Sequence, residues 1–182
     1  MPFFILAGQL LDHTGATKRL MSFAEALVGH LKGGLAHINI VASMFFAGIT
    51  GSAVADTSAI GSLLIPSMIS HGYKASFSAA ITAISSVIGV IVPPSILMVL
   101  YAVAVDLSVG KLLLAGALPG LLLGFSQMLT VFWYAHKEGY PKGENFQFGR
   151  FFRSCWRAIL PLMVVIIIVG GIYGGIFTPT EA

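Results

Sequence analysis

The chain has 182 residues, 57% of them hydrophobic and only 9% charged, and its mean hydropathy is +0.92. A soluble domain carries about 25% charged residues, so this composition excludes a water-soluble protein and predicts an integral membrane protein with about four to six helical segments. The net charge of +3 is scattered and lacks the stacking aromatics of a nucleic-acid surface, and the single Cys155 excludes an internal disulfide and a cysteine metal cluster.

Two different segments open the chain. Residues 1–12 are apolar and have neither the basic start nor the cleavage site of a signal peptide, so we expect the end of a transmembrane helix and a chain that is a fragment. In residues 13–35, Leu20, Phe23 and Leu27 recur at helical spacing, and charged residues take other positions. This pattern predicts an amphipathic helix, packed either on other protein or in the membrane interface as an arm.

Residues 48–61 form the least ordinary stretch of the chain, because they are small, polar and rich in glycine between two apolar runs. Irregular polar backbone is tolerated in a membrane only where it is buried in protein or lines a watery cavity. Transporters place substrate and ion sites in such breaks. The enclosing segment, residues 36–72, crosses the membrane once, crosses it twice as short helices, or forms a re-entrant helical hairpin.

Charge and length favour the re-entrant hairpin. It leaves nine of the ten basic residues on one side and only Lys111 on the other, as the positive-inside rule prefers, whereas a single span divides them six and four. A helix over residues 36–50 would reach about 22 Å, short of a hydrocarbon core of about 30 Å. The hairpin tip would then stop near mid-depth. Two short crossings give the same charge split and stay open as the alternative.

Residues 75–105 carry no charge and predict a transmembrane helix that is broken at residues 89–95 by Pro93 and Pro94. Each proline removes a backbone donor and clashes with the preceding turn. The carbonyls of residues 89–92 would lose their helical partners beside the Ser95 hydroxyl, an oxygen-rich set suited to Na⁺. The restarting half-helix would offer its N-terminus to an anion. A purely structural proline kink is the alternative.

Asp56 is the only charged residue between Lys32 and Lys74. An ionisable side chain at membrane depth costs roughly 3 kcal/mol on insertion scales and is a candidate for function. In the alternative, structural interpretation, Asp56 with Thr57 and Ser58 caps the returning half of the hairpin. The sequence favours neither interpretation.

The second half of the chain predicts further membrane helices. Residues 107–136 form a transmembrane helix whose row of Gly116, Gly120 and Gly124 permits close packing. Residues 137–157 predict a cytoplasmic loop and an amphipathic helix, and residues 158–182 a last transmembrane helix. Histidines stand singly and no catalytic arrangement appears, so we expect neither an enzyme nor a histidine metal site.

Several motifs together resemble a known family. They comprise residues 45–56, Phe-Phe-Ala-Gly-Ile-Thr-Gly-Ser-Ala-Val-Ala-Asp, and the shorter stretches 65–68, 71–73, 93–95, 115–120 and 178–182. These residues resemble the large membrane subunit of tripartite ATP-independent periplasmic (TRAP) transporters, the DctM-like family, over essentially the whole chain.

The resemblance implies an all-α, elevator-type secondary transporter of the bacterial inner (cytoplasmic) membrane, built from two inverted repeats. It would couple Na⁺ entry to uptake of an organic acid, of the C4-dicarboxylate or sugar-acid class. A periplasmic solute-binding protein would deliver this substrate, and a small TRAP membrane subunit would be a further partner. No cofactor is implied besides Na⁺ as the coupling ion. The chain holds a partial inverted repeat and stops where the second repeat should begin.

On the family pattern, the hairpin tip and the helix break supply one Na⁺ site and half of the substrate site. The expected substrate-binding residues are Thr50, Gly51, Ser52, Asp56, Ser58 and Ser95, and the expected Na⁺ ligands are Ser52, Gly89, Val92 and Pro94. Two alternatives stay open: an ion-coupled anion carrier that works without a binding protein, and a non-transporting membrane scaffold fragment. A scaffold would not need two polar breaks at mid-depth.

Overall fold

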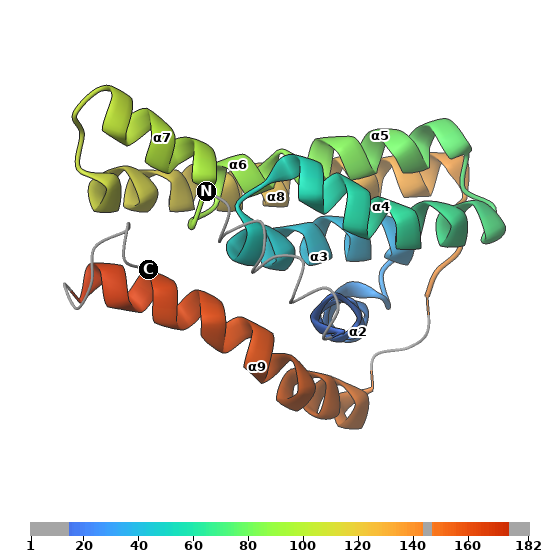
Figure 1. The fold of residues 1–182 in the computed structure, drawn as a ribbon. Coiled ribbons are helices and arrows are strands. Elements are labelled where there is room, and N and C mark those ends of the chain that lie inside the picture. Colours follow the sequence, from blue (N-terminus) through green and yellow to red (C-terminus); the bar gives the residue numbers. More distant parts are fainter. Residues whose placement is uncertain (1–14, 144–146, 175–182) are drawn as a thin grey trace.

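The computed structural model describes residues 15–143 and 147–174, and these residues are almost entirely helical (Figure 1). No β-strand occurs among them, which confirms the predicted all-α class. The residues 1–12 and 178–182, for which a helix end and a family motif were predicted, lie outside the described part of the chain. The helices are α2 (Ala16–Val28), α3 (Gly34–Thr50), α4 (Ala53–Ser70), α5 (Ala75–Ser86), α6 (Ile88–Ile91), α7 (Ile96–Ala104), α8 (Val109–Glu138) and α9 (Phe148–Tyr173).

Helices α3 and α4 lie side by side as an antiparallel hairpin (Figure 1). Two residues reverse the chain between them: Gly51 has a φ of 58°, and Ser52 is extended with φ −131° and ψ 116°. The Ser52 hydroxyl caps α4 by accepting a hydrogen bond from the Ala55 amide at 3.4 Å. A left-handed residue followed by a capping serine explains why the apolar run divides here.

The next helices form the bent pair that the two prolines predicted. Helices α5 and α6 together meet α7 at an angle of 45° across a short break. Val92 is extended, as expected for the residue before a proline, and Ser95 is extended as the N-cap of α7. The opening is confined to residues 92–95, because α6 continues as a helical turn through Gly89 to Ile91. A further small interruption at Val87, between α5 and α6, was not predicted.

Helix α8 packs against this broken rod through its glycines. A Cβ atom at Gly116 would lie 2.5 Å from the Ile91 carbonyl oxygen, and one at Gly120 would lie 2.5 Å from a Val92 methyl carbon. The third glycine, Gly124, faces the thioether of a methionine in α3. Glycine has no side chain beyond a hydrogen atom, so α8 can approach residues 91 and 92 this closely. The glycine row therefore determines which part of α8 packs against the helix break.

The described helices carry the surface expected of a membrane protein. Helices α4 and α8 are each long and apolar enough to cross a bilayer, and the bent α5–α7 pair makes a third candidate if it is counted as one span. Large apolar side chains project outward from α8, among them Leu118 and Phe125, which are more than 60% exposed. An apolar surface of this kind needs lipid or further protein to cover it.

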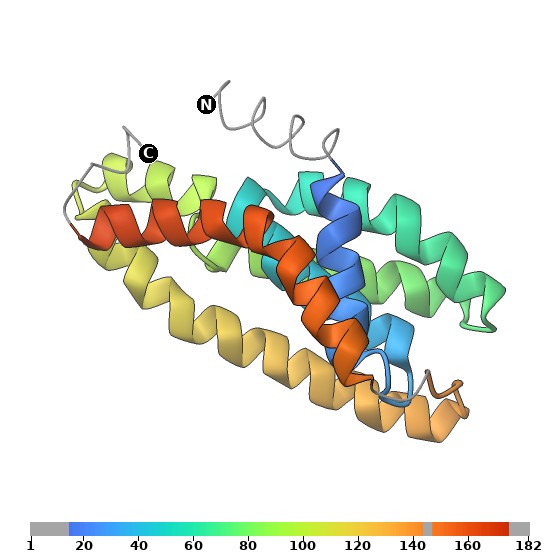
Figure 2. The same ribbon diagram turned by 90° about the horizontal axis from the view of Figure 1, so that it is seen from below.

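Helix α2 crosses α9 and lies against α3 (Figure 2). Leu20 and Phe23 are buried, and Lys18 and Arg19 are exposed, which is the amphipathic arrangement predicted for residues 13–35. The helix ends at Val28, well before the end of that range. The glycines that follow Val28 allow the chain to turn directly into the hairpin.

Candidate functional site

The hairpin tip touches the helix break directly. The Ile96 amide donates a hydrogen bond to the Gly51 carbonyl at 3.4 Å. A Cβ atom at Gly51 would lie 2.7 Å from the Pro94 carbonyl oxygen and 3.2 Å from the Ser95 Cα. Only glycine permits this approach, and its φ of 58° is also one that L side chains rarely adopt. The two polar breaks found in the sequence are therefore in direct contact in the structure.

Two helices begin at this contact, and a serine caps each of them. Ser52 is half-buried and its hydroxyl accepts from the first turn of α4, while the Ser95 hydroxyl accepts from the Met98 amide of α7 at 3.3 Å. The N-terminus of a helix carries a partial positive charge and unpaired amides. An anionic group placed at the contact would meet two such ends together with hydroxyl oxygens.

The expected Na⁺ ligands divide into two groups. Ser52 and the Pro94 carbonyl lie at the tip–break contact. Gly89 lies within the helical turn α6, and Val92 packs against Gly120 of α8. The Val90 carbonyl, which the prolines deprive of a helical partner, accepts a hydrogen bond of 2.6 Å from the Ser95 hydroxyl.

Two more of the expected substrate residues differ in their surroundings. Thr50 is buried, donates its hydroxyl proton to the Phe46 carbonyl at 3.2 Å, and accepts from the Ser52 amide at 3.5 Å. Thr50 thus holds the tip in shape from inside α3. Ser58 is exposed on α4, one turn beyond the tip, and the structure does not bring it to the contact.

Asp56 lies in the first turn of α4 but is completely buried. Within residues 15–143 and 147–174, neither carboxylate oxygen has a hydrogen-bond partner, and the hydroxyls of Ser43 in α3 and Ser86 in α5 are polar neighbours of the carboxylate. The side chain therefore sits in the interface between the hairpin and α5. The capping role that the sequence allowed for Asp56 is carried by Ser52.

A buried polar network beside Asp56 was missed by the sequence reasoning. The Asn39 side-chain amide donates to the Thr82 hydroxyl at 2.7 Å, the Ser85 hydroxyl donates to the Asn39 oxygen at 3.1 Å, and Ser43 donates to Ser85 at 3.2 Å. All four side chains are fully buried. The signal was present in the sequence, because Ser78, Thr82, Ser85 and Ser86 recur at helical spacing along one face of α5.

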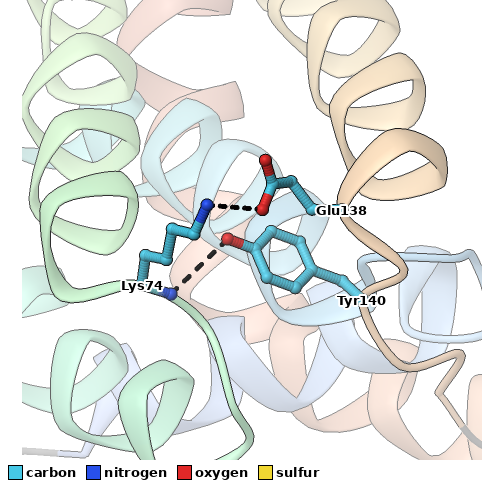
Figure 3. A network of polar contacts seen from close by, with 3 residues as sticks. All are labelled: Lys74, Glu138 and Tyr140. Atoms are coloured by element: carbon cyan, nitrogen blue, oxygen red, sulfur yellow. Dashed lines mark hydrogen bonds and ion pairs between the residues drawn. The ribbon is translucent and has the colours of Figure 1, made fainter.

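The opposite end of the hairpin is tied to the C-terminal end of α8 (Figure 3). The Lys74 ammonium donates to Glu138 at 2.5 Å, and the Lys74 amide donates to the Tyr140 hydroxyl at 3.4 Å. The hydrogen bond to Glu138 raises the pKa of Lys74. Tyr73 stacks on Tyr140 at 4.3 Å, and burial raises the pKa of Tyr73 to about 12. The Gly33 amide completes the link by donating to a loop carbonyl after α8 at 3.1 Å.

Comparison with known proteins decides the family. The family model described as "Tripartite ATP-independent periplasmic transporter, DctM component" matches residues 1–182, the whole chain. The chain belongs to the DctM family. This confirms the resemblance inferred from the motifs at the hairpin tip and the helix break.

Individual relatives are similar over the whole chain. It is 47% identical to the isethionate TRAP transporter permease protein DctMQ of Oleidesulfovibrio alaskensis, 44% to the sialic acid TRAP transporter large permease protein SiaM of Vibrio cholerae, and 42% to the C4-dicarboxylate TRAP transporter large permease protein DctM of Pseudomonas aeruginosa. The chain spans 29%, 43% and 43% of these relatives. All three are named as permeases, which supports the prediction that the chain is not an enzyme.

Proposed function

We propose that the chain is part of the membrane subunit of a Na⁺-coupled secondary transporter in the bacterial inner membrane. Its substrate is an organic acid, handed over by a periplasmic solute-binding protein, and a small TRAP subunit is its membrane partner. The contact of the hairpin tip with the helix break carries this proposal, because it combines two helix N-termini with hydroxyl and carbonyl oxygens.

The relatives support the class of substrate. Isethionate, sialic acid and C4-dicarboxylates, which appear in the relatives' names, are all organic anions. The residues at the tip–break contact, 50–52 and 93–96, include no arginine, lysine or histidine. In our proposal the acid is therefore held by serine hydroxyls and by the amides at the starts of α4 and α7.

The coupling ion is proposed to bind at the same contact. Ser52 is half-buried, Gly51 precedes it in the tip, and the Pro94 carbonyl of the break lies against Gly51. Hydroxyl and carbonyl oxygens are hard ligands of the kind that unwound transporter helices offer to Na⁺. Of the four expected ligands, Ser52 and Pro94 are the ones proposed for the arrangement seen here. The carbonyls of Gly89 and Val92 could bind the ion only if the helix break changed its conformation.

The re-entrant path of the hairpin is proposed from the level of its tip. The tip meets the break where α8 presents Gly116 and Gly120, and the nine residues of α7 continue beyond it for about 13 Å at 1.5 Å per residue. The two base loops, with Lys32 and Lys74, lie at the other end, beside the end of α8. A tip that stops short while its neighbours continue suits a hairpin that ends inside the bilayer, with α2 as the arm.

The test is uptake into proteoliposomes that hold the protein with its small subunit, supplied with binding protein and a panel of organic acids, with and without a Na⁺ gradient. We expect uptake of one class of acid that requires the gradient. Ser52→Ala should weaken the apparent Na⁺ affinity by about tenfold, the equivalent of one lost ligand of 1.4 kcal/mol. The control Ser62→Ala, which removes an exposed hydroxyl of the same helix that donates to the Ala59 carbonyl, should not.

Two results would contradict parts of the proposal. Unchanged Na⁺ dependence and affinity in Ser52→Ala would remove the tip from the ion site. Uptake that proceeds equally well without the binding protein would favour the alternative, an anion carrier that works without one.

A further inference from the structure

The start of α9 has an arginine face and an aromatic face. Arg150, Arg153 and Arg157 follow one another at intervals of three and four residues, so they share one side of the helix. Phe152 and Trp156 lie on another side, where they are 74% and 77% exposed. The chain from residue 158 to the end of α9 carries no charge. The arginines therefore stand where a polar helix end passes into an apolar helix.

The arginine face lines an open cleft between α9 and α2. The cleft has a volume of about 690 Å³. Figure 2 shows α2 crossing the first half of α9 at this place. The lining residues from α2 are Ser22 and Glu25, and those from the start of α9 and the residue before it are Gln147, Gly149, Arg150, Arg153, Ser154 and Arg157.

The charge of the cleft is positive. Among the described residues that line the cleft, Glu25 is the one with a carboxylate, and it is bound to Arg150 at 2.9 Å. Arg153 and Arg157 form no ion pair with any residue in the described ranges 15–143 and 147–174. A neighbouring cavity of about 230 Å³ shares Glu25 and Arg150 with the cleft and adds Lys142 to its lining. The site thus offers two guanidinium groups that the carboxylate does not neutralise.

The position of these groups selects the ligand. Guanidinium binds phosphate through paired, planar hydrogen bonds, more specifically than an ammonium does. Exposed tryptophan and phenylalanine at the end of an apolar helix are typical of the headgroup level of a bilayer. Basic clefts between helices at this level on the cytoplasmic side bind anionic lipid headgroups. We propose that the α2–α9 cleft binds the phosphate of an anionic phospholipid, with Arg153 and Arg157 as its principal contacts.

Native mass spectrometry of the protein in detergent, titrated with phosphatidylglycerol or phosphatidylcholine, tests this site. We expect phosphatidylglycerol to bind more tightly than phosphatidylcholine. The double variant Arg153→Gln, Arg157→Gln should lose about tenfold or more in affinity for phosphatidylglycerol, because it removes both guanidinium groups that would bind the phosphate. The control Lys111→Gln, Lys137→Gln removes the same charge from exposed positions of α8 outside the cleft and should bind like the wild type.

A lysine variant and competition with inorganic phosphate test the site further. The double variant Arg153→Lys, Arg157→Lys keeps the charge and removes the planar fork, so it should lose a smaller amount, about threefold, even if the glutamine variant fails to fold. Full displacement of phosphatidylglycerol by millimolar inorganic phosphate would assign the cleft to a soluble anion and overturn the lipid proposal. Equal losses in the cleft variant and the control, or no preference over phosphatidylcholine, would also overturn it.

Discussion

The two ends of the α3–α4 hairpin are built differently. At the base, Lys74, Glu138 and Tyr140 are joined by hydrogen bonds, and Tyr73 stacks on Tyr140. At the tip, one backbone hydrogen bond joins Gly51 to the helix break, and the Ser52 hydroxyl that caps α4 keeps capacity for a further partner. The base is thus held by an ion pair and ring stacking, whereas the tip keeps a hydroxyl that can bind a ligand.

Each end also has a glycine with a left-handed backbone, and here too they differ. Gly51 at the tip has the break within contact distance, whereas a Cβ atom at Gly72, with a φ of 86°, would meet nothing within 4 Å. The same substitution at these positions therefore separates backbone strain from contact with the break.

The largest effect on transport is expected from Gly51→Ala. The added methyl group would lie 2.7 Å from the Pro94 carbonyl oxygen in addition to the backbone strain, so the break must move away. We expect proteoliposome uptake to fall by about tenfold or more, which corresponds to a displacement cost of 1.4 kcal/mol at the site. Gly72→Ala carries only the strain of roughly 1–2 kcal/mol and should keep its uptake. Equal uptake in both variants would show that the tip–break contact does not matter to transport.

The next effect compares two serine caps. Ser95→Ala removes the cap of α7 and leaves the Val90 carbonyl without its donor, so we expect a loss of about 2–3 kcal/mol in stability. Ser108→Ala removes only the exposed cap of α8, and about 0.5–1 kcal/mol should be lost. Thermal unfolding in detergent measures both. Similar losses of stability in the two variants would mean that the hydrogen bond from Ser95 to the Val90 carbonyl contributes no stability beyond that of an ordinary helix cap.

A smaller effect is expected at the base. Glu138→Gln removes the partner of an exposed lysine, and salt screens such pairs. We expect a small drop in the unfolding midpoint that shrinks at high salt. Because the ion pair raises the pKa of Lys74, its stabilisation is present below the ordinary lysine pKa and disappears as the pH rises through the raised value. A drop that is independent of salt would assign the effect to packing.

The smallest effect is spectroscopic. Burial raises the pKa of Tyr73 from 10.0 to about 12, so the neutral phenol is favoured in the fold and its stabilisation is lost between these pH values. The phenolate absorbance of the wild type minus that of Tyr73→Phe should therefore rise with a midpoint near 12. A midpoint near 10 would show that Tyr73 is in contact with water.

The sequence predicted both breaks, because glycine and proline act on the backbone wherever they stand. The family resemblance implied that the tip and the break share a site, but the residues alone could not predict that Gly51 touches Pro94 and Ser95, since that contact depends on the packing of α8 along the broken rod. Asp56 illustrates the same limit. Its rarity marked it as unusual, but whether it faces the tip or α5 depends on the rotation of α4, which periodicity in a nearly uniform apolar segment does not define.

The buried network was missed for a related reason. The hydroxyl of a serine or threonine in a membrane helix can donate a hydrogen bond to a backbone carbonyl of the preceding turn, as Ser86 does to Thr82. The presence of these residues in a sequence therefore does not predict hydrogen bonds to another helix. Asn39 cannot satisfy its side chain in this way as fully, and that side chain joins α3 to Thr82 and Ser85 of α5.

The fastening of the hairpin base to α8 has a mechanical consequence. Lys74 is bonded to Glu138 and the Gly33 amide to the loop just after α8, so both legs of the hairpin are fastened to one long rod. A shift of α8 along its axis would therefore act on both legs of the hairpin at once, and we expect the hairpin to move with α8 as one unit.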